Sequence, residues 1–215
     1  MRELPGGRLS GQPAGNRKIR VACIGDSVTW GYAMTNRTEE CYPAQLQRLL
    51  GSAYDVRNFG VPGAGVYSQP RPNAQGWTAK VWRDSELARE AYAFRPDIVI
   101  SNLGVNNAFD YMREFTPGRD GRMEREPDTF YREYVALLKA FATERGQSPR
   151  LIVWTRLNPH GKKHRLKGKP NAFVMARDLE RVAQDVGAER IADLYELLFP
   201  YCETEHYAAD GCHPE

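Results

Sequence analysis

The stretch IRVACIGDSVTW, residues 19–30, decides the fold of this chain. Its first part, residues 19–25, is a short, apolar, β-rich run that ends in glycine, which is typical of a buried strand. The DSV that follows is where a helix is expected to begin. Similar apolar runs recur four times along the chain, as YDVRNFG (54–60), DIVISNLG (97–104), LIVWTR (151–156) and RIADL (190–194).

Helical patterns separate these predicted strands. They lie at YPAQLQRLLG (42–51), within residues 78–94, at 128–146 and at 171–187. Pro43 and Gly51 fit the start and end of the first helix, and Asp128 is a plausible N-cap for the third. Regular alternation of strands and helices predicts an α/β fold with a five-stranded parallel sheet covered on both faces. Ligands of such sheets bind beyond the carboxyl ends of the strands.

The bulk properties indicate one domain. The chain has 215 residues and a formal net charge of +3, and it contains no apolar run long enough to cross a bilayer. Residues 1–18 are expected to form a flexible Gly/Pro-rich tail, and residues 19–215 the domain. We expect no nucleic-acid or membrane partner, and a cytoplasmic location unless a secretion signal was removed from the chain.

The four cysteines show no metal-binding pattern. Cys23 lies within the first predicted strand and is expected to be a small buried hydrophobe. A bridge between Cys202 and Cys212 is conceivable, although reduced thiols fit a cytoplasm better.

Three segments that follow the first three strands carry polar or glycine residues suited to catalysis. Ser27 could act as a nucleophile, the backbone N–H of Gly63 could donate to an oxyanion, and the amide of Asn106 could do the same. Each also has a structural interpretation. Asp26 and Ser27 could simply cap a helix, Gly63 could serve a turn, and asparagine is common in turns.

The chain ends in DGCHPE, which places Asp210 three residues before His213. This spacing occurs by chance in surface loops, but it also suits a carboxylate that orients a catalytic imidazole. Because the segment follows the fifth predicted strand, both residues are expected at the same edge of the sheet as Ser27.

The ordered set of GDS at residues 25–27, NFGVPG at 58–63, GVNN at 104–107 and the final Asp-x-x-His resembles the SGNH (GDSL-type) hydrolase family. The resemblance covers residues 19–215 and implies a flavodoxin-like three-layer α/β/α sandwich. It implies Ser27, Asp210 and His213 as catalytic residues. It also implies an oxyanion hole made of the N–H groups of Ser27 and Gly63 and the side chain of Asn106, with no metal and no organic cofactor.

The same resemblance predicts a serine esterase that acts through an acyl-enzyme on small O-acyl esters of the acetyl type, with acylated carbohydrates as possible substrates. Two alternatives remain open at this point. One is a lipase or thioesterase that cleaves longer acyl chains, and the other is a non-hydrolytic binding module on the same fold.

Two departures from the family pattern affect these expectations. Asn107 stands where the family usually has an Asp that acts as a structural hydrogen-bonding partner, so loop order should suffer before chemistry does. The chain also stops two residues after His213, where members of the family continue into a helix that packs on the sheet. We therefore expect a fragment whose final helix is missing and whose sheet exposes an apolar strip.

Two further features concern the substrate. Trp30 is the tryptophan that the motifs place near the site, where it could stack on a sugar ring. The long segment 108–127 that follows GVNN is expected to be a loop that covers the substrate.

Overall fold

A computed structural model describes residues 17–72, 76–107, 115–117, 123–125, 128–142, 148–154 and 171–191. The expected N-terminal tail and the Cys202 and Cys212 pair lie outside these ranges, and so does the chain end on which the expectation about a final helix depends. Asp210 and His213 lie outside them as well. The account that follows is restricted to the described residues.

Five parallel strands form the central sheet in the order β2-β1-β5-β8-β9. Their bounds are Ile19–Gly25 for β1, Tyr54–Gly60 for β2, Ile98–Ser101 for β5, Arg150–Trp154 for β8 and Glu189–Ile191 for β9. Because β5 returns to the other side of β1, the order is that of a flavodoxin-like doubly wound sheet. The five-strand prediction is therefore confirmed.

Four longer helices connect these strands and match the predicted ones. They are α3 (Tyr42–Leu50), α4 (Glu86–Phe94), α6 (Thr129–Lys139) and α7 (Asn171–Asp185), and two shorter helices are α1 (Ser27–Trp30) and α2 (Arg37–Glu40). Asp128 stands at the N-cap of α6, but its side chain makes no cap hydrogen bond. Its carboxylate instead accepts from Arg181 of α7 at 3.0 Å, so it joins two helices.

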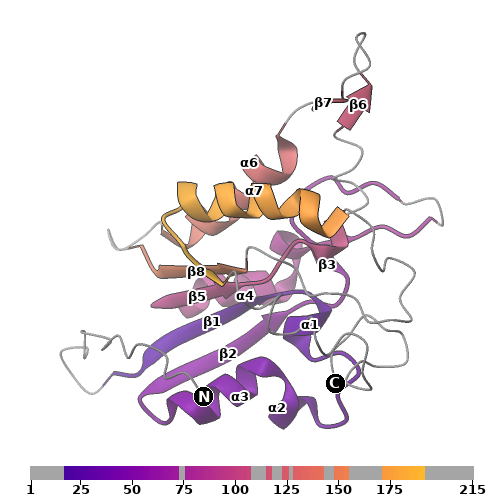
Figure 1. Ribbon diagram of the computed structural model, residues 1–215. Coiled ribbons are helices and arrows are strands. Elements are labelled where there is room, and N and C mark those ends of the chain that lie inside the picture. The colour runs from indigo at the N-terminus through magenta and orange to yellow at the C-terminus, as the bar shows by residue number, and fades with distance from the viewer. Residues whose placement is uncertain are drawn as a thin grey trace, which may run out of the picture.

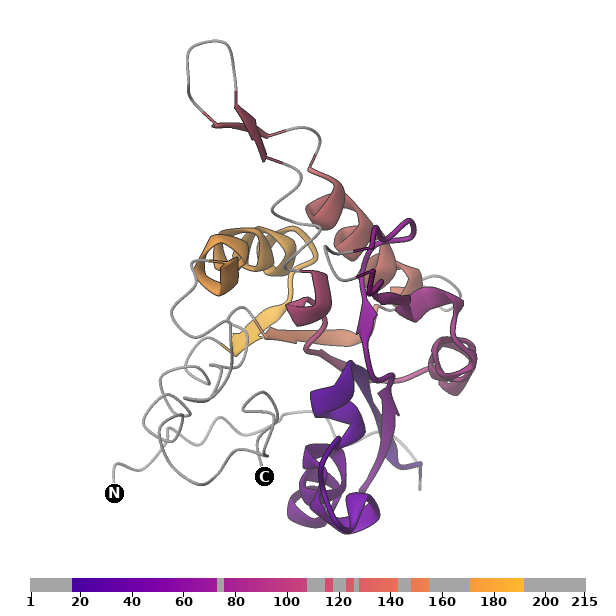
Figure 2. The ribbon, with the colours of Figure 1, turned by 90° about the vertical axis from the view of Figure 1, so that its right-hand side faces the viewer.

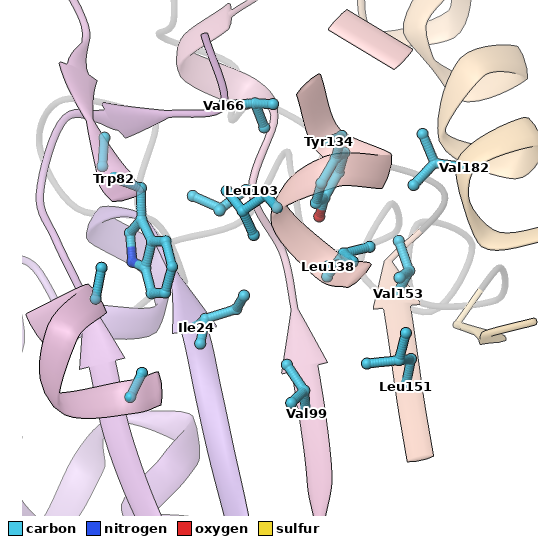
Figure 3. Packing of buried hydrophobic residues seen from close by; sticks show 14 of the residues in the cluster. Ile24, Val66, Trp82, Val99, Leu103, Tyr134, Leu138, Leu151, Val153 and Val182 are labelled. Carbon is cyan, nitrogen blue, oxygen red and sulfur yellow. The ribbon is translucent and has the colours of Figure 1, made fainter. Parts of the chain in front are cut away.

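Helices α4, α6 and α7 pack on one face of the sheet and α3 packs on the other (Figure 1). The larger core lies under the three helices. Figure 3 shows side chains of strands and helices converging there, among them Ile24, Val99, Leu151, Val153, Tyr134, Leu138 and Val182. Helices α6 and α7 each bury a row of side chains against the sheet, including Phe130, Tyr134, Leu137, Met175, Leu179 and Val182.

The second face has a smaller core beneath α3. Val21, Cys23, Ile100 and Trp154 are buried there, and the rings of Tyr42 and Trp154 lie 5.5 Å apart. The prediction of a buried, reduced Cys23 is confirmed. The structure also contains two short strand pairings that were not expected from the sequence.

The first of these pairings is parallel and joins β3 (Ala64–Gly65) to β4 (Lys80–Val81). The second is antiparallel and joins β6 (Phe115–Pro117) to β7 (Met123–Arg125), within the segment expected to cover the substrate. Figures 1 and 2 both show β6 and β7 outside the three layers, beyond α6 and α7. Among the residues that the structure describes, no helix combines the length and the apolar character needed to cross a bilayer.

Candidate active site

The carboxyl ends of β1, β2 and β5 meet at one edge of the sheet, which faces the viewer in Figure 2. Backbone hydrogen bonds join the segments that leave this edge. The N–H of Val61 donates to Gly25 O at 2.9 Å, and the N–H of Asn102 donates to Ile24 O at 3.3 Å. The segments that carry Ser27, Gly63 and Asn106 therefore begin side by side.

Ser27 is the first residue of α1 and is half-buried. Asp26 is the N-cap, and its Oδ1 accepts from the N–H of Val28 at 2.9 Å. The helix ends after one turn because Gly31, with φ of 88°, returns its N–H to Ser27 O at 3.0 Å. Asp26 thus caps the helix. Ser27 lies at the edge of the sheet, and because it is in the first turn, its backbone N–H cannot donate to a carbonyl of the same helix.

Asp26 is an unusual cap because its side chain is only 1% exposed. Burial raises the pKa of this carboxyl to about 7, since a charged carboxylate loses its hydration there. Within the described part of the chain, its Oδ2 has no hydrogen-bond partner. The residue before the predicted nucleophile therefore titrates near neutral pH.

Gly25 has to be a glycine because the hydrogen bond between Thr29 and Asn102 occupies the space of a side chain. Thr29 Oγ1 donates to Asn102 Oδ1 at 2.6 Å, and both side chains are buried. A Cβ atom on Gly25 would lie 1.8 Å from that Oδ1, which no side chain tolerates. Sequence reasoning missed Thr29 and Asn102, because their pairing joins positions 73 residues apart.

Asn58 attaches the second segment to α1. Its Nδ2 donates to Thr29 O at 2.8 Å, and its Oδ1 accepts from the N–H of Gly60 at 2.9 Å. A Cβ atom on Gly60 would lie 2.3 Å from Trp30 N, so glycine allows the strand end to approach the helix closely. The Asn and Gly of NFG could have suggested such a turn, although not its partner.

Gly63 is the third residue of a tight turn. The N–H of Ala64 donates to Val61 O at 2.9 Å, Pro62 takes the second position and Gly63 has φ of 78°. This is the residue pattern of a type II turn, which needs positive φ at its third position. The turn interpretation of Gly63 is confirmed, and its role as an oxyanion donor remains a prediction.

Asn106 joins the third segment to this turn. It lies in a short 3-10 helix, η2 (Val105–Asn107), and its Nδ2 donates to Ala64 O at 2.9 Å. An amide nitrogen carries two hydrogens, so a second one remains for an oxyanion after this bond. The bond holds the Asn106 amide beside Ala64, the residue after Gly63, and the role of Asn106 as an oxyanion donor remains a prediction.

Asn107 is fully buried, and its Oδ1 accepts from the N–H of Val66 at 2.8 Å. A carboxylate could make the same bond, so asparagine retains this contact between η2 and the second segment. Its Nδ2, however, has no hydrogen-bond partner among the described residues. The Asn107 side chain packs closely against Gly65, since a Cβ atom at residue 65 would lie 2.5 Å from Asn107 Nδ2.

Two tryptophans lie close to this edge, although the motifs indicated one. Trp30 is half-buried, and the guanidinium of Arg37 lies 4.5 Å from its ring centroid. Trp77 is 42% exposed, and its Cζ2 lies 3.7 Å from where a Cβ atom on Gly63 would stand. No sequence pattern indicated that Trp77 lies near Gly63, because Trp77 belongs to no motif.

Comparisons with known proteins point to one family. The sequence profile of the GDSL-like lipase/acylhydrolase family matches residues 23–215. An acetylxylan esterase of Xylanibacter ruminicola is 29% identical over 204 residues, which is 91% of this chain and 40% of that protein. The chain thus spans less than half the length of this relative.

Solved structures agree with the fold. A crystal structure of an acetyl xylan esterase aligns with a TM-score of 0.61 at 17% identity, covering 92% of each chain. A carbohydrate acetylesterase family member from Sinorhizobium meliloti aligns with a TM-score of 0.55 at 18% identity, covering 80% of this chain and 82% of that one. With its profile match across residues 23–215 and its three interlocked segments at the sheet edge, the chain belongs to the GDSL-like lipase/acylhydrolase family.

Proposed function

We propose that this chain is a serine esterase that removes small acyl groups of the acetyl type from carbohydrates. One observation carries the proposal. The Val61 to Gly25 and Asn106 to Ala64 hydrogen bonds, both 2.9 Å, bring the turn that contains Gly63 beside Ser27 and Asn106. A nucleophile and preorganised N–H donors at one edge suit acyl transfer.

The first half of the reaction forms an acyl-enzyme. Ser27 Oγ attacks the acyl carbon while His213 accepts the hydroxyl proton, and Asp210 orients the imidazole and stabilises its charged form. The N–H groups of Ser27 and Gly63 and the Asn106 amide donate to the resulting oxyanion. The intermediate then breaks the bond to the leaving alcohol, which takes the proton from His213.

Water completes the cycle. It attacks the acyl carbon of the ester on Ser27 as His213 removes one of its protons, and the same N–H donors hold the second oxyanion. Breaking the bond to Ser27 Oγ releases the carboxylic acid, and the proton returns to the serine oxygen. No step consumes a metal or an organic cofactor.

The substrate class is proposed from relatives. The X. ruminicola protein and one of the aligned structures are named as acetylxylan esterases, and another aligned structure as a carbohydrate acetylesterase. An acetyl group is small, and the sugar ring that carries it is a neutral, polar alcohol. We therefore propose acetylated xylose units as the first substrates to examine.

An ester panel tests this proposal. The purified chain should hydrolyse p-nitrophenyl acetate much faster than p-nitrophenyl decanoate, and it should release acetate from acetylated xylan. The Ser27→Ala variant is the control and should release none above the buffer rate. A preference for decanoate would support the lipase or thioesterase alternative. A folded protein that turns over none of these esters would support a binding module.

A further inference from the structure

Trp77 presents an indole ring to solvent beside the turn that contains Gly63. Three large hydrophobic side chains are exposed among the described residues, namely Tyr32 at 48%, Leu49 at 84% and Trp77 at 42%. Trp77 Cζ2 lies 3.7 Å from the position that a Cβ atom on Gly63 would take. The indole therefore lies on the side of Gly63 where a side chain would stand, beside the residue proposed to bind the oxyanion.

Backbone pairing holds Trp77 in this place. Three residues later, β4 pairs with β3 in parallel register, Lys80 opposite Ala64, and the N–H of Lys80 donates to Gly63 O at 2.9 Å. Two residues beyond Lys80, Trp82 is fully buried and its Nε1 donates to Phe59 O at 3.0 Å. The β3–β4 pairing and the buried Trp82 thus anchor the backbone three to five residues from the exposed ring.

Trp30 offers a poorer surface for a ligand. It is half-buried, and the guanidinium of Arg37 covers one face of its ring at 4.5 Å. Trp77, by contrast, is 42% exposed. The more exposed indole is therefore the one next to Gly63.

We propose that Trp77 binds the sugar ring of the substrate by stacking, and that it thereby selects carbohydrate esters over simple ones. The inference rests on the proposed esterase function and goes further by naming the residue that recognises the alcohol. In an O-acetyl sugar, the ring carbon is bonded to the ester oxygen, so the ring begins two bonds from the acyl carbon. When Gly63 holds the oxyanion, the pyranose lies beside Gly63, where the indole is.

The face of a pyranose ring and the face of the Trp77 indole are chemically complementary. A pyranose presents a face of C–H bonds that packs flat on an indole, while its hydroxyl groups stay in water. A flexible alkyl chain gains more from a groove that encloses it than from one exposed ring. An exposed indole therefore suits a sugar better than a long acyl chain.

Three acetates that differ only in their alcohol test the proposal. Methyl acetate has no ring, phenyl acetate has a flat aromatic ring, and a mono-acetylated methyl xyloside has a pyranose. We expect Trp77→Ala to lower kcat/KM for the xyloside by about tenfold, mainly through KM, and to leave methyl acetate unchanged. Trp77→Phe should recover part of the loss. Leu49→Ala, which removes an exposed hydrophobe on α3, should change none of the three.

Two results would overturn the inference. An equal loss for methyl acetate and the xyloside would mean that Trp77 acts on the Gly63 turn rather than on the sugar. A loss confined to phenyl acetate would mean that an aromatic alcohol is its ligand. Thermal unfolding of each variant confirms that it is folded before its kinetics are compared.

Calorimetric binding of xylobiose separates this inference from the proposed function. If the wild-type chain hydrolyses none of the acetates, the esterase proposal fails, but xylobiose binding that is lost in Trp77→Ala still supports a sugar-stacking residue. If the wild-type chain binds no xylobiose and Trp77→Ala spares the xyloside reaction, Trp77 does not recognise sugars.

Discussion

The carboxyl edge of the sheet and the face beneath α6 and α7 are both buried, but different forces stabilise them. The described residues include six buried polar side chains, and four of them, Asp26, Thr29, Asn102 and Asn107, hold this edge together. The face beneath the helices buries Phe130, Leu137, Leu138, Met175, Leu179 and Val182. Apolar contacts depend on area and tolerate small shifts, whereas hydrogen bonds depend on direction.

This difference separates function from stability. The edge contains Thr29, Asn58, Asn102 and Asn107, whose side chains bond to other segments at 2.6–2.8 Å. We expect substitutions of the polar residues that contact substrate to alter turnover first. Substitutions in the apolar face should alter the free energy of unfolding first. Five predictions examine this contrast, from the largest effect to the smallest.

The two serines at the strand ends give the largest contrast. Ser27→Ala should lower kcat by roughly 10³–10⁶ with no change in thermal stability, because it removes the proposed nucleophile. Ser101 Oγ lies 2.7 Å from Tyr134 OH in the interior, so Ser101→Ala should instead lower the free energy of unfolding by about 1–3 kcal/mol and leave kcat intact. Steady-state kinetics and urea unfolding of both variants provide the comparison, and wild-type turnover by folded Ser27→Ala would exclude the mechanism.

One buried leucine and one exposed leucine test how much the apolar face contributes to stability. Leu179 of α7 is fully buried, so Leu179→Ala should lower the free energy of unfolding by about 2–5 kcal/mol through lost burial and a new cavity. Leu49 of α3 is 84% exposed, and Leu49→Ala should change stability by less than about 0.5 kcal/mol. Both variants should keep the kcat of the folded protein. A large loss of kcat in Leu179→Ala would show that this face and the edge are coupled.

Asn106→Ala tests the oxyanion donor. Loss of a donor that acts in the transition state should reduce kcat by about 10²–10³, with a smaller effect on KM. Asn36 is an exposed asparagine in the loop before α2, and Asn36→Ala serves as the matched control with unchanged kinetics. A change confined to KM would identify Asn106 as a ground-state contact.

Asp26 should make the protein less stable as the pH rises. Its folded pKa is about 7, well above the value of about 3.9 for an unfolded Asp. Between these values the folded chain holds a proton that the unfolded chain has lost, so the free energy of unfolding falls, by about 2–4 kcal/mol in total.

Asp26→Asn should abolish this pH dependence and be more stable than the wild type at pH 8, because the amide oxygen can still accept from Val28. Urea unfolding at pH 5 and pH 8 measures the effect, with Asp84→Asn as the exposed control. An Asp26→Asn curve parallel to that of the wild type would show that the carboxyl does not titrate in this range.

The smallest effect concerns the predicted base, His213. kcat/KM should fall about tenfold per pH unit below an apparent pKa of about 6.5. Because Asp26 titrates near the same pH, the profile should be measured in Asp26→Asn as well, where the acidic limb should persist. If the limb disappears in that variant, Asp26 and not His213 is the group that controls activity.

Local sequence patterns were sufficient to predict the layer architecture of the described chain. β1 and β2 begin and end where their apolar runs do, at residues 19–25 and 54–60. The helix near residues 42–51 was also predicted correctly. Such features are local, since hydrophobic periodicity and the conformational limits of proline and glycine act within a few neighbouring residues.

The sequence also indicated which residues carry chemistry, but the tertiary structure decided how they are held. The Thr29–Asn102 and Val66–Asn107 bonds join positions 73 and 41 residues apart, and no local pattern encodes either pairing. Gly25 has to be glycine because the first of these bonds occupies the space of its Cβ atom. The proximity of Trp77 to Gly63 likewise depends on the pairing of β3 with β4. Close approach between distant segments is a property of the folded chain, and it emerges only when the strands are assembled.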